Sequence, residues 1–475
     1  MAQDAVLAPI FRTAVWWLAD DKFTGIDWSF ADAVNLDIRD CVREVKISQK
    51  PTLITWLTAQ CTAMIYTSNN KLVVFCDDWK IFLESSGSLT QVTTATPSTK
   101  IYSACEFNGY LYWTTYGKLH RIEIANINTT FTGNETINRQ ALENSNYYPM
   151  LASVWDMWWD MYVWHAGKIG KVDTSNVWNN AVTMDSGWEI KYLLDLWGSI
   201  RIITTPRSWK STLYLRDWAK DSPDQTIPLN WIDVLQTIIY NWYHYIITSD
   251  GMWIMDGYRI HWLNERHDFS NVVWAIAIMN KYMIIGSKDS YLYVYGAKTK
   301  NYTEVLNKEY VITAPSWTTW TFTIDTIVTV GKKIYFTWHT ASAYWLNLLD
   351  TEQNIETNCG AMGYLITRAY YANTMYDVKE TLRACIWFQA LRDNENIKIY
   401  YSIDGWEFTK IGDYTDATTL LDNFTDDIEI NSSDFQYIQF KIELYRWSKT
   451  VNNTTTYTSP RFNMLDLVFN NNIRR

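Results

Sequence analysis

Six cysteines are the residues of this chain best suited to zinc or redox chemistry, and their spacing argues against both. They stand far apart along the 475 residues, at Cys41, Cys61, Cys76, Cys105, Cys359 and Cys385. A zinc or redox motif needs pairs in a C-x-x-C arrangement, which none of them forms. We therefore expect buried free thiols, as in a protein assembled in a reducing cytoplasm.

The six histidines are equally dispersed, at His120, His165, His244, His261, His267 and His339. Only His261 and His267 flank one short segment, and a pair in such a loop is more often solvated than bound to a metal ion. The sequence also has no nucleophile elbow, P-loop, H-E-x-x-H motif or EF-hand loop. We expect no metal site and no cofactor.

Glycoside hydrolysis would need two carboxylates that meet in one pocket, about 5 to 9.5 Å apart. Candidates at expected strand ends or turns are Asp195, Asp217, Asp250, Asp256 and Asp325. A sialic-acid site would need three convergent arginines, for which Arg201, Arg207, Arg216 and Arg259 are available. Asp is common in turns for local reasons, and the arginines have no special spacing, so we expect no catalytic or cofactor-binding residues and no enzyme activity.

Residues 401–408, with the sequence YSIDGWEF, resemble an Asp box, the S-x-D-x-G-x-x-[WF] hairpin of sialidases and other β proteins. The matching residues are Ser402, Asp404, Gly405 and Phe408. The resemblance implies a structural turn, in which the Asp side chain accepts hydrogen bonds from backbone N–H groups of its own loop. It implies no catalytic role.

The elements that carry these residues are short strands, rich in β-branched and aromatic residues and separated by turns. One strand–turn–strand unit recurs. Its turns fall at Asn70-Lys71, Asn108-Gly109, Trp159-Asp160, Trp197-Gly198, Asn241-Trp242, Asn280-Lys281 and Gly331-Lys332. The mean interval is about 43 residues, close to the 40–45 of a propeller blade. We predict an all-β chain with a seven-bladed β-propeller over residues 52–360; a long sandwich or solenoid is the alternative.

The pattern changes on both sides of the expected propeller. Longer strands joined by polar loops, at 382–389, 397–402, 437–444 and 462–469, predict an antiparallel β-sandwich over residues 364–475. The segment 359–363 contains Gly360 and Gly363 and is expected to be a linker. Residues 1–51 have no blade pattern and predict an extended N-terminal arm that packs on a neighbour or on the propeller.

The charge balance excludes several function classes. The formal net charge is −10 and there is no basic stripe, so nucleic-acid binding has little support. The sequence contains no run of 18 apolar residues, so it predicts no membrane span. The first residues lack the charged and apolar regions of a secretory signal.

Tryptophan and glycine are out of proportion. The chain has 27 Trp and only 18 Gly, whereas average usage predicts about 33 Gly. Trp79, Trp242 and Trp406 follow Asp, Asn or Gly between alternating apolar runs, where tight turns need φ > 0 and therefore favour glycine. We hypothesise that many of these tryptophans are UGA codons read as glycine in the natural source. The alternative is a genuinely Trp-rich protein that stacks sugars on its indoles.

Residues 196–260 resemble a segment of uncharacterised phage virion proteins. The resemblance lies in WGSIRI (197–202), TPRSWK (205–210), LYLRDW (213–218), the turns at Asn241-Trp242 and Asp256-Gly257, and the close IQFKIEL (438–444) with Ser459-Pro460-Arg461. It implies a non-enzymatic tail or virion component, assembled in the host cytoplasm, that joins other virion proteins and is a homo-oligomer. No functional residue can be transferred with it.

Three functions therefore stay open. The first is a virion structural protein that gives a rigid β scaffold for assembly or host-surface adhesion, with the Asn/Thr-rich segments 126–136 and 452–458 as candidate contacts. The second is a propeller lectin, which requires that the tryptophans are real. The third is a glycan hydrolase or depolymerase on the same propeller.

Overall fold

The computed structural model of the chain is almost entirely β-structure. It describes residues 6–12, 30–37, 45–85, 87–93, 99–115, 118–132, 135–137, 150–153, 161–165, 168–172, 178–183, 190–196, 199–204, 211–217, 224–229, 234–248, 251–256, 259–263, 272–296, 305–312, 322–351, 359–371, 379–392, 395–415, 423–451 and 454–471. Within these residues the one helical element is a single 3₁₀ turn, η1 (Ile124–Asn126). Nothing in this part of the chain is a helix of the length and apolarity that a membrane span needs.

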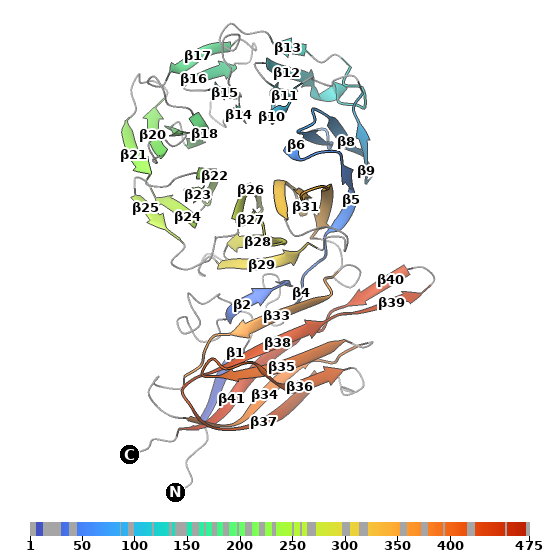
Figure 1. Cartoon of the computed structure of the whole chain (residues 1–475), viewed down its shortest axis with the longest axis vertical. Coiled ribbons are helices and arrows are strands. Elements are labelled where there is room, and N and C mark those ends of the chain that lie inside the picture. Colours follow the sequence, from blue (N-terminus) through green and yellow to red (C-terminus); the bar gives the residue numbers. More distant parts are fainter. Residues whose placement is uncertain are drawn as a thin grey trace.

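Most of the chain forms four-stranded antiparallel sheets that follow one another in sequence and are arranged around a centre (Figure 1). The first three sheets are β6 (Cys61–Tyr66), β7 (Leu72–Cys76), β8 (Ile81–Ser85) and β9 (Ser88–Gln91); β10 (Ile101–Phe107), β11 (Tyr110–Thr115), β12 (Lys118–Glu123) and β13 (Glu135–Ile137); β14 (Met150–Ser153), β15 (Met161–His165), β16 (Lys168–Val172) and β17 (Trp178–Thr183). The next two are β18 (Ile190–Leu196), β19 (Ser199–Thr204), β20 (Ser211–Asp217) and β21 (Gln225–Leu229); β22 (Val234–Tyr240), β23 (Tyr243–Thr248), β24 (Gly251–Asp256) and β25 (Arg259–Trp262).

Two further groups of four strands differ in how they end. The strands β26 (Val272–Met279), β27 (Tyr282–Ser287), β28 (Tyr291–Gly296) and β29 (Val305–Val311) continue into a larger sheet. The strands β30 (Thr323–Val330), β31 (Lys333–His339) and β32 (Tyr344–Asp350) take their fourth strand from the N-terminal side, β5 (Thr52–Leu57). A strand from before the first sheet therefore completes the last one.

Five of the seven predicted turns lie in described residues, and each of these falls between the first and second strand of a group. Among them, Asn70, Asn108, Asn241 and Asn280 have φ of 63°, 46°, 47° and 55°. These left-handed values are tolerated by Asn because its short side chain can bond to the local backbone. The turns at Trp159-Asp160 and Trp197-Gly198 lie outside the described residues, although β14–β15 and β18–β19 flank them.

The tryptophans of the turns divide into two kinds. Trp79 and Trp242 have φ of 59° and 72°, as the turn chemistry predicts, and both are exposed. The prediction is wrong for Trp406, since Asp404 and Gly405 take the left-handed conformations of that turn, at 48° and 81°. Trp406 is exposed but needs no unusual backbone.

The hydrophobic core lies between neighbouring sheets. Phe75 of β7 and Trp113 of β11 belong to one buried cluster, with ring centroids 6.3 Å apart. A second cluster joins β26–β29 to β30–β32 and includes Trp338 and Trp345. The first, innermost strands also touch: β6 contacts both β10 and β30, and β22 contacts both β18 and β26. Packing of successive sheets by their faces is the arrangement of a propeller.

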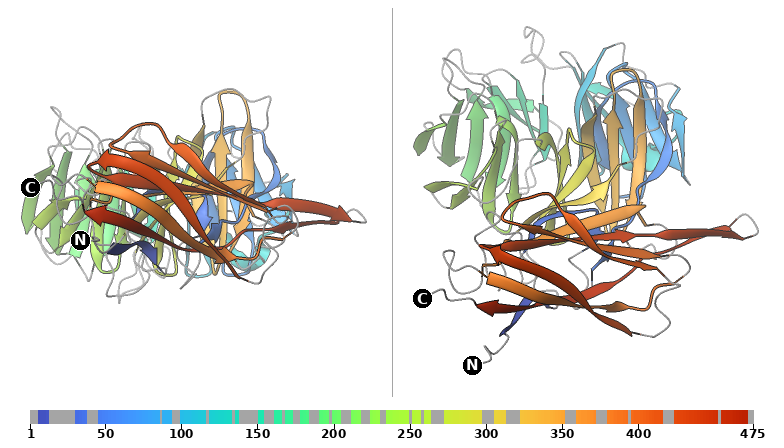
Figure 2. Two further views of the ribbon diagram at one scale, coloured as in Figure 1. Left: turned by 90° about the horizontal axis from the view of Figure 1, so that it is seen from below. Right: turned by 60° about the horizontal axis from the view of Figure 1, so that its bottom comes forward.

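Most of the remaining strands build two sheets below the propeller (Figure 2). One is β1 (Val6–Arg12), β41 (Phe462–Asn471), β34 (Lys379–Gln389) and β37 (Asn423–Phe435). The other contains β2 (Phe30–Val34), β33 (Met362–Thr367), β38 (Ile438–Tyr445), β35 (Asn396–Ile403) and β36 (Thr409–Thr415). Side chains from both, such as Ile386, Leu465, Ile399 and Phe440, share one buried cluster. The four strands predicted from sequence in this region correspond to β34, β35, β38 and β41.

Residues 1–51 need a correction, because their described strands are part of the C-terminal sheets rather than a separate arm. β1 pairs antiparallel with β41, and β2 pairs antiparallel with β33. The short strands β3 (Leu36–Asp37) and β4 (Lys46–Ile47) then lead to the propeller. Pairing across more than 400 residues leaves no local signal, so the sequence alone showed only that the blade pattern was missing.

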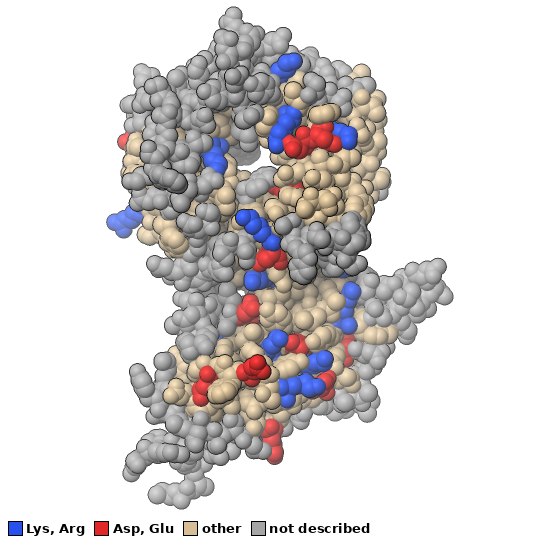
Figure 3. Space-filling model, in the orientation of Figure 1, with Lys and Arg blue, Asp and Glu red and all other residues tan. Residues whose placement is uncertain are grey.

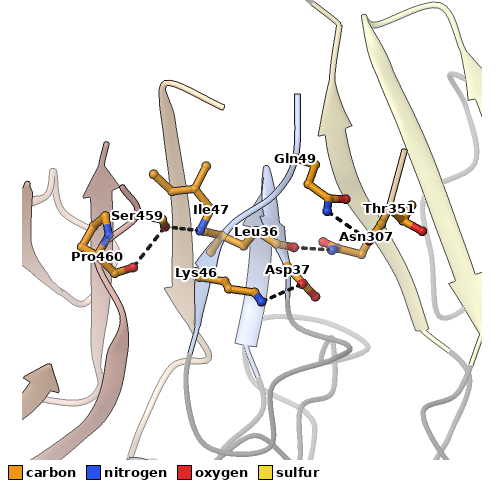
Figure 4. A network of polar contacts seen from close by, with 9 residues as sticks. All are labelled: Leu36, Asp37, Lys46, Ile47, Gln49, Asn307, Thr351, Ser459 and Pro460. Carbon is orange, nitrogen blue, oxygen red and sulfur yellow. Dashed lines mark hydrogen bonds and ion pairs between the residues drawn. The ribbon is translucent and has the colours of Figure 1, made fainter. Parts of the chain in front are cut away.

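A continuous sheet joins the two halves of the molecule. β2 pairs in parallel with β29 at one residue pair, Val34 and Lys308, so that β26 to β29 and the strands β2, β33, β38, β35 and β36 form one nine-stranded sheet. Figure 4 shows the polar contacts beside this junction: Asn307 Nδ2 donates to the Leu36 carbonyl at 3.3 Å, and Gln49 Nε2 donates to the Thr351 carbonyl at 3.1 Å. On the other side, Ile47 N donates to Ser459 Oγ at 2.9 Å.

The predicted linker at 359–363 is also a packed part of this junction. A Cβ at Gly363 would lie 2.6 Å from the Asn35 carbonyl oxygen and 2.5 Å from Leu36 Cδ2. Asn35, which has φ of 56°, donates from Nδ2 to the Met362 carbonyl at 2.6 Å. The glycines therefore allow a close backbone approach, rather than flexibility between two domains.

Candidate functional site

One face of the propeller carries a repeated irregularity. The register slips near the start of the innermost strands β6, β10, β18, β22, β26 and β30. In four of them the slip is at the second residue, Thr62, Tyr102, Lys191 or Leu235, and in β30 it is at the third, Asp325. A β-bulge bends a strand and redirects a side chain, and bulges are common beside functional sites. We call this the strand-start face. The sequence analysis missed it, because such bulges have no fixed turn residues.

Asp325 is the buried acidic member of this set. Its Oδ1 accepts hydrogen bonds from His339 Nδ1 at 2.7 Å and from Gln60 Nε2 at 2.8 Å. Asp325 and His339 belong to β30 and β31, whereas Gln60 lies just before β6. This cluster therefore ties the last sheet of the ring to the first.

The protonation of the cluster follows from its burial. Burial raises the pKa of Asp325, although the hydrogen bond from His339 acts in the opposite direction. The same hydrogen bond raises the pKa of His339, whose side chain is 25% exposed. With Nδ1 donating to Asp325, the other ring nitrogen is available on the exposed side to accept a hydrogen bond or a proton. The pair can bind a ligand that donates a hydrogen bond, or act as a base.

A polar turn lies next to this cluster on the same face. Asp77 N donates to the Gln60 carbonyl at 2.8 Å, and Thr58 Oγ1 donates to Asp78 Oδ2 at 2.7 Å. Lys100 pairs with Asp77 at 2.5 Å. Exposed Trp79 follows at the tip of the turn. The face therefore combines mixed charges with one indole, a composition suited to recognition of polar surfaces.

Two of the predicted thiols lie beside the cluster but are unreactive. Cys61 and Cys76 face each other in the register of β6 and β7. Burial raises the pKa of Cys61 to about 12 and that of Cys76 further still. The prediction of buried free thiols is confirmed for Cys61, Cys76, Cys105 and Cys359, while Cys385 is only partly buried and Cys41 lies outside the described residues.

The candidate carboxylates do not converge as far as the structure describes them. Asp195 and Asp217 lie at the ends of β18 and β20, and Asp256 lies at the end of β24. Because successive strands run in opposite directions, these three ends are at the face opposite Asp325. Asp250 lies outside the described residues.

The candidate arginines are also separated where their side chains are described. Arg201 is buried on β19, with Nη1 3.3 Å from Met255 Sδ, whereas Arg259 is exposed on the outermost strand β25. Arg207 lies outside the described part of the chain. The same is true of His267, so the pair with exposed His261 cannot be placed. The described residues hold no group of three His, Cys, Asp or Glu side chains with metal-binding geometry.

Two other histidines are buried inside the sheets. His120 stacks on Trp113, with centroids 5.4 Å apart, and His244 bonds through Nε2 to Thr237. Burial lowers the pKa of His120 to about 4 and that of His244 to about 3. Both are therefore neutral at physiological pH and have structural contacts.

These histidines predict a dependence of stability on pH. In the unfolded chain they titrate near about pH 6.5, so between that value and their folded pKa values the unfolded state binds more protons. Their contribution to the free energy of unfolding is thus lost as the pH falls below about 6.5. We expect the urea midpoint of His244→Gln to fall less between about pH 7 and pH 4.5 than that of the wild type. Equal falls in the two proteins would contradict this.

The Asp-box-like residues make hydrogen bonds within a turn, but the partners of Asp404 differ from those that the resemblance implies. Ser402 Oγ donates to the Trp406 carbonyl at 2.5 Å, which closes the turn between β35 and β36. Asp404 Oδ1 accepts from Gln436 N and Tyr437 N at 2.8 and 2.9 Å. These amides belong to the turn between β37 and β38, not to the loop of Asp404 as expected. Gly405 has the left-handed φ of the turn, and Phe408 is partly exposed.

Asp404→Ala is expected to lower the free energy of unfolding by about 1–2 kcal/mol, since it removes two charge-assisted hydrogen bonds between hairpins. Chemical denaturation measures the loss. The matched control is Asp413→Ala on the neighbouring strand, which breaks an exposed pair with Lys410 at 2.8 Å. That pair is worth at most about 1 kcal/mol. A smaller effect at Asp404 than at Asp413 would refute the bridging role.

A concave site lies on the face opposite the strand starts. A cavity of about 430 Å³ is lined by the ends of β6 and β30, with Met64, Tyr66, Ser68, Val328 and Thr329 among its residues. Its lining is apolar and hydroxyl-bearing, so it suits shape-based contacts rather than proton transfer. Figure 3 shows an opening through the middle of the ring, with positive and negative side chains interspersed around it.

Comparison with known proteins identifies the fold alone. No family model matches the chain, and no curated protein matches it. Among solved structures, a streptogramin B lyase is 12% identical, with a TM-score of 0.47, and covers 64% of this chain and 98% of its own. The WD40 β-propeller domain of Doa1 is 12% identical, with a TM-score of 0.43, and covers 63% and 97%. The Cps50 (Swd1) β-propeller domain of Myceliophteria thermophila is 9% identical, with a TM-score of 0.45, and covers 62% and 99%. The predicted β-propeller is confirmed at this level, and these similarities carry nothing about function.

Proposed function

We propose that this chain is a non-enzymatic structural protein of a phage virion, placed in the tail and assembled in the host cytoplasm. In this proposal a seven-bladed propeller and a C-terminal β-sandwich form one rigid scaffold for assembly or host-surface adhesion. The strand-start face, with Lys100 and Asp77, is the surface that it presents for contact.

The strand groups support the finer details of this fold. Seven groups of four strands follow one another, and the contact of β30 with β6 and the pairing of β5 with β32 support closure of a ring. Two sheets that share the cluster of Ile399, Phe440 and Leu465 support a sandwich. Closing the last blade with an N-terminal strand protects the edges of the ring.

The nine-stranded sheet is the observation that carries the proposal. An enzyme or sensor of two domains commonly moves one against the other, whereas here β29 and β2 pair directly. Asn35 N donates to the Lys308 carbonyl at 2.8 Å beside this pairing. A rigid union of two β units suits a part that must transmit position and force within an assembly.

Fractionation of particles from the natural source tests the proposed role. Particles purified on a density gradient and washed in high salt should contain tryptic peptides of this chain, in fixed ratio to the other particle proteins. Peptides found only in the soluble cell fraction would contradict a virion role. Hydrolysis of host-surface glycans by the purified protein would contradict the proposal that it is not an enzyme.

We also propose that some of the tryptophans are UGA codons that the natural host of the virion reads as glycine. Left-handed backbone costs a bulky L-residue about 1–2 kcal/mol, and Trp79 and Trp242 both have it. By contrast, Trp113, Trp338 and Trp345 are buried in the core and have ordinary backbone. We propose that the first two positions are glycine in the natural protein and that the buried three are tryptophan.

Trp242→Gly is expected to raise the free energy of unfolding by about 0.5–1 kcal/mol, because it relieves the left-handed strain at modest entropic cost. Trp406→Gly is the matched control: Trp406 is 79% exposed and has ordinary φ, so a loss of a few tenths of a kcal/mol is expected there. Thermal and urea unfolding of both variants provide the measurement. Destabilisation at Trp242 equal to that at Trp406 would count against recoding.

A lectin is the second candidate, favoured by the exposure of Trp79 and Trp242 if both are genuine tryptophans. Binding of the tryptophan form and the Trp79→Gly/Trp242→Gly form to a glycan array discriminates the two. Glycan binding that needs the indoles would favour the lectin. Equal behaviour of the two forms would favour the scaffold.

A further inference from the structure

The hairpin formed by β39 (Trp447–Val451) and β40 (Thr454–Thr458) stands away from the rest of the molecule. It continues from the end of β38 and projects beyond the C-terminal sheets in every view (Figures 1 and 2). The two strands pair only with each other among the described strands. We call this hairpin the β39–β40 arm.

Hydrogen bonds hold the base of the arm, whereas among the described strands β39 and β40 pair only with each other. Arg446 N donates to the Ala361 carbonyl at 3.1 Å, and the Arg446 guanidinium donates to the Cys359 carbonyl. At the other end Ser459 Oγ accepts from Ile47 N at 2.9 Å. A two-stranded ribbon by itself is only marginally stable in water, since each strand has half of its backbone N–H and C=O groups pointing away from the other strand.

The chemistry of the arm differs from that of the other sheet edges in the C-terminal half. The edge strand β37 carries Asp426, Asp427, Glu429 and Asp434, and β36 carries Lys410 and Asp413. The edge strand β1 contains Pro9. Charges and proline are the usual means of keeping an edge from pairing with another chain. β40 has the sequence TTTYT, with neither.

We propose that the β39–β40 arm is a dimerisation element, in which β40 pairs antiparallel with β40 of a second copy of this chain. An uncharged strand meets no like charge when it faces itself, whereas β37 would place acidic residues opposite one another. Threonine pairs across strands are favourable by about 0.2–1 kcal/mol each. Because the arm projects, two bodies of net charge −10 can join there without close approach.

Two-fold symmetry, together with pairing along the whole length of β40 (Thr454–Thr458), fixes the register of this four-stranded sheet. In an isologous contact, residue i of one copy faces residue j of the other, and j faces i. For β40 this places Thr454 opposite Thr458 and centres the pairing on Thr456. The described part of the Asn/Thr-rich segment, residues 454–458, is thereby a contact between copies, and not a receptor site.

The test is light scattering after size exclusion, over a range of protein concentrations, with two substitutions in the arm. The wild type is expected to be a dimer at high concentration. Thr456→Lys places two like charges opposite each other at the symmetry centre and is expected to give a monomer. Thr450→Lys adds the same charge on the other edge of the ribbon, at β39, and is expected to leave the dimer intact.

Cross-linking gives the register independently. Thr456→Cys is expected to form an intermolecular disulfide under mild oxidation, with the unsubstituted protein as the control for its own cysteines. A wild-type monomer at all concentrations, a trimer or larger ring, or equal behaviour of the two lysine variants would each overturn the pairing. Failure of Thr456→Cys to cross-link a protein that still dimerises would also overturn it. A monomer would leave the proposed virion role in place.

Discussion

Replacing Trp345 by alanine is expected to lower the free energy of unfolding by about 3–5 kcal/mol, the usual range for deleting a large buried aromatic side chain. Trp345 is fully buried on β32 and stacks on Trp338, with ring centroids 4.0 Å apart. It also meets Trp56 of β5 at 5.3 Å, so it packs the strand that completes the last sheet. The loss should therefore release β5 from the last sheet.

Urea denaturation measures the overall loss, and limited proteolysis within residues 45–60 reports on release of β5. Trp406→Ala is the control, because it removes an indole of the same size that is 79% exposed. We expect that control to change stability by less than about 0.5 kcal/mol. Equal losses from both variants would show that Trp345 does not pack the closing strand.

Replacing Gly363 by alanine is expected to cost about 1–3 kcal/mol, because overpacking forces backbone shifts. The added Cβ would meet the Asn35 carbonyl oxygen at 2.6 Å, and backbone cannot move aside as a flexible side chain can. The strain falls on the pairing of β2 with β33 and then with β29. We expect faster hydrogen exchange across this junction than in the wild type.

The control for Gly363 lies two residues away in the same segment. Ala361 is exposed, so Ala361→Ser should change neither stability nor exchange by a measurable amount. Equal protection of the junction amides from hydrogen exchange in Gly363→Ala and in the control would contradict this prediction. It would mean that the joined sheet does not depend on the close approach of the two backbones at Gly363.

The blades could be predicted because their turns have local chemistry. Asn108, Asn241 and Asn280 mark first turns by residue type alone, and their spacing gives the repeat. The closing strand could not be predicted, because β5 pairs with β32 almost 300 residues later and has no distinguishing composition. The same reason hid the pairing of β1 with β41, and so led to the expectation of a separate arm.

Only part of the candidate site could be predicted from the sequence. Asp325 was one of five carboxylates placed at strand ends or turns, and nothing in the sequence distinguished it; its partners Gln60 and His339 come from before β6 and from β31. The bulges that redirect this residue leave no sequence signature. Asp404 was predicted to be structural through its own loop, whereas its partner amides lie some 32 residues away, which a loop motif does not encode.

Hydrogen exchange of the wild-type protein tests most directly the claim that propeller and C-terminal sheets are one rigid body. The amides of Asn35 and Gly360, which bond to Lys308 and Ser48, should exchange as slowly as those of β27, a strand of the nine-stranded sheet that is paired on both sides. That result requires the junction to open only with the sheet as a whole. Fast exchange of the junction amides beside slow exchange in β27 would mean that the two halves move independently, and the scaffold account would be wrong.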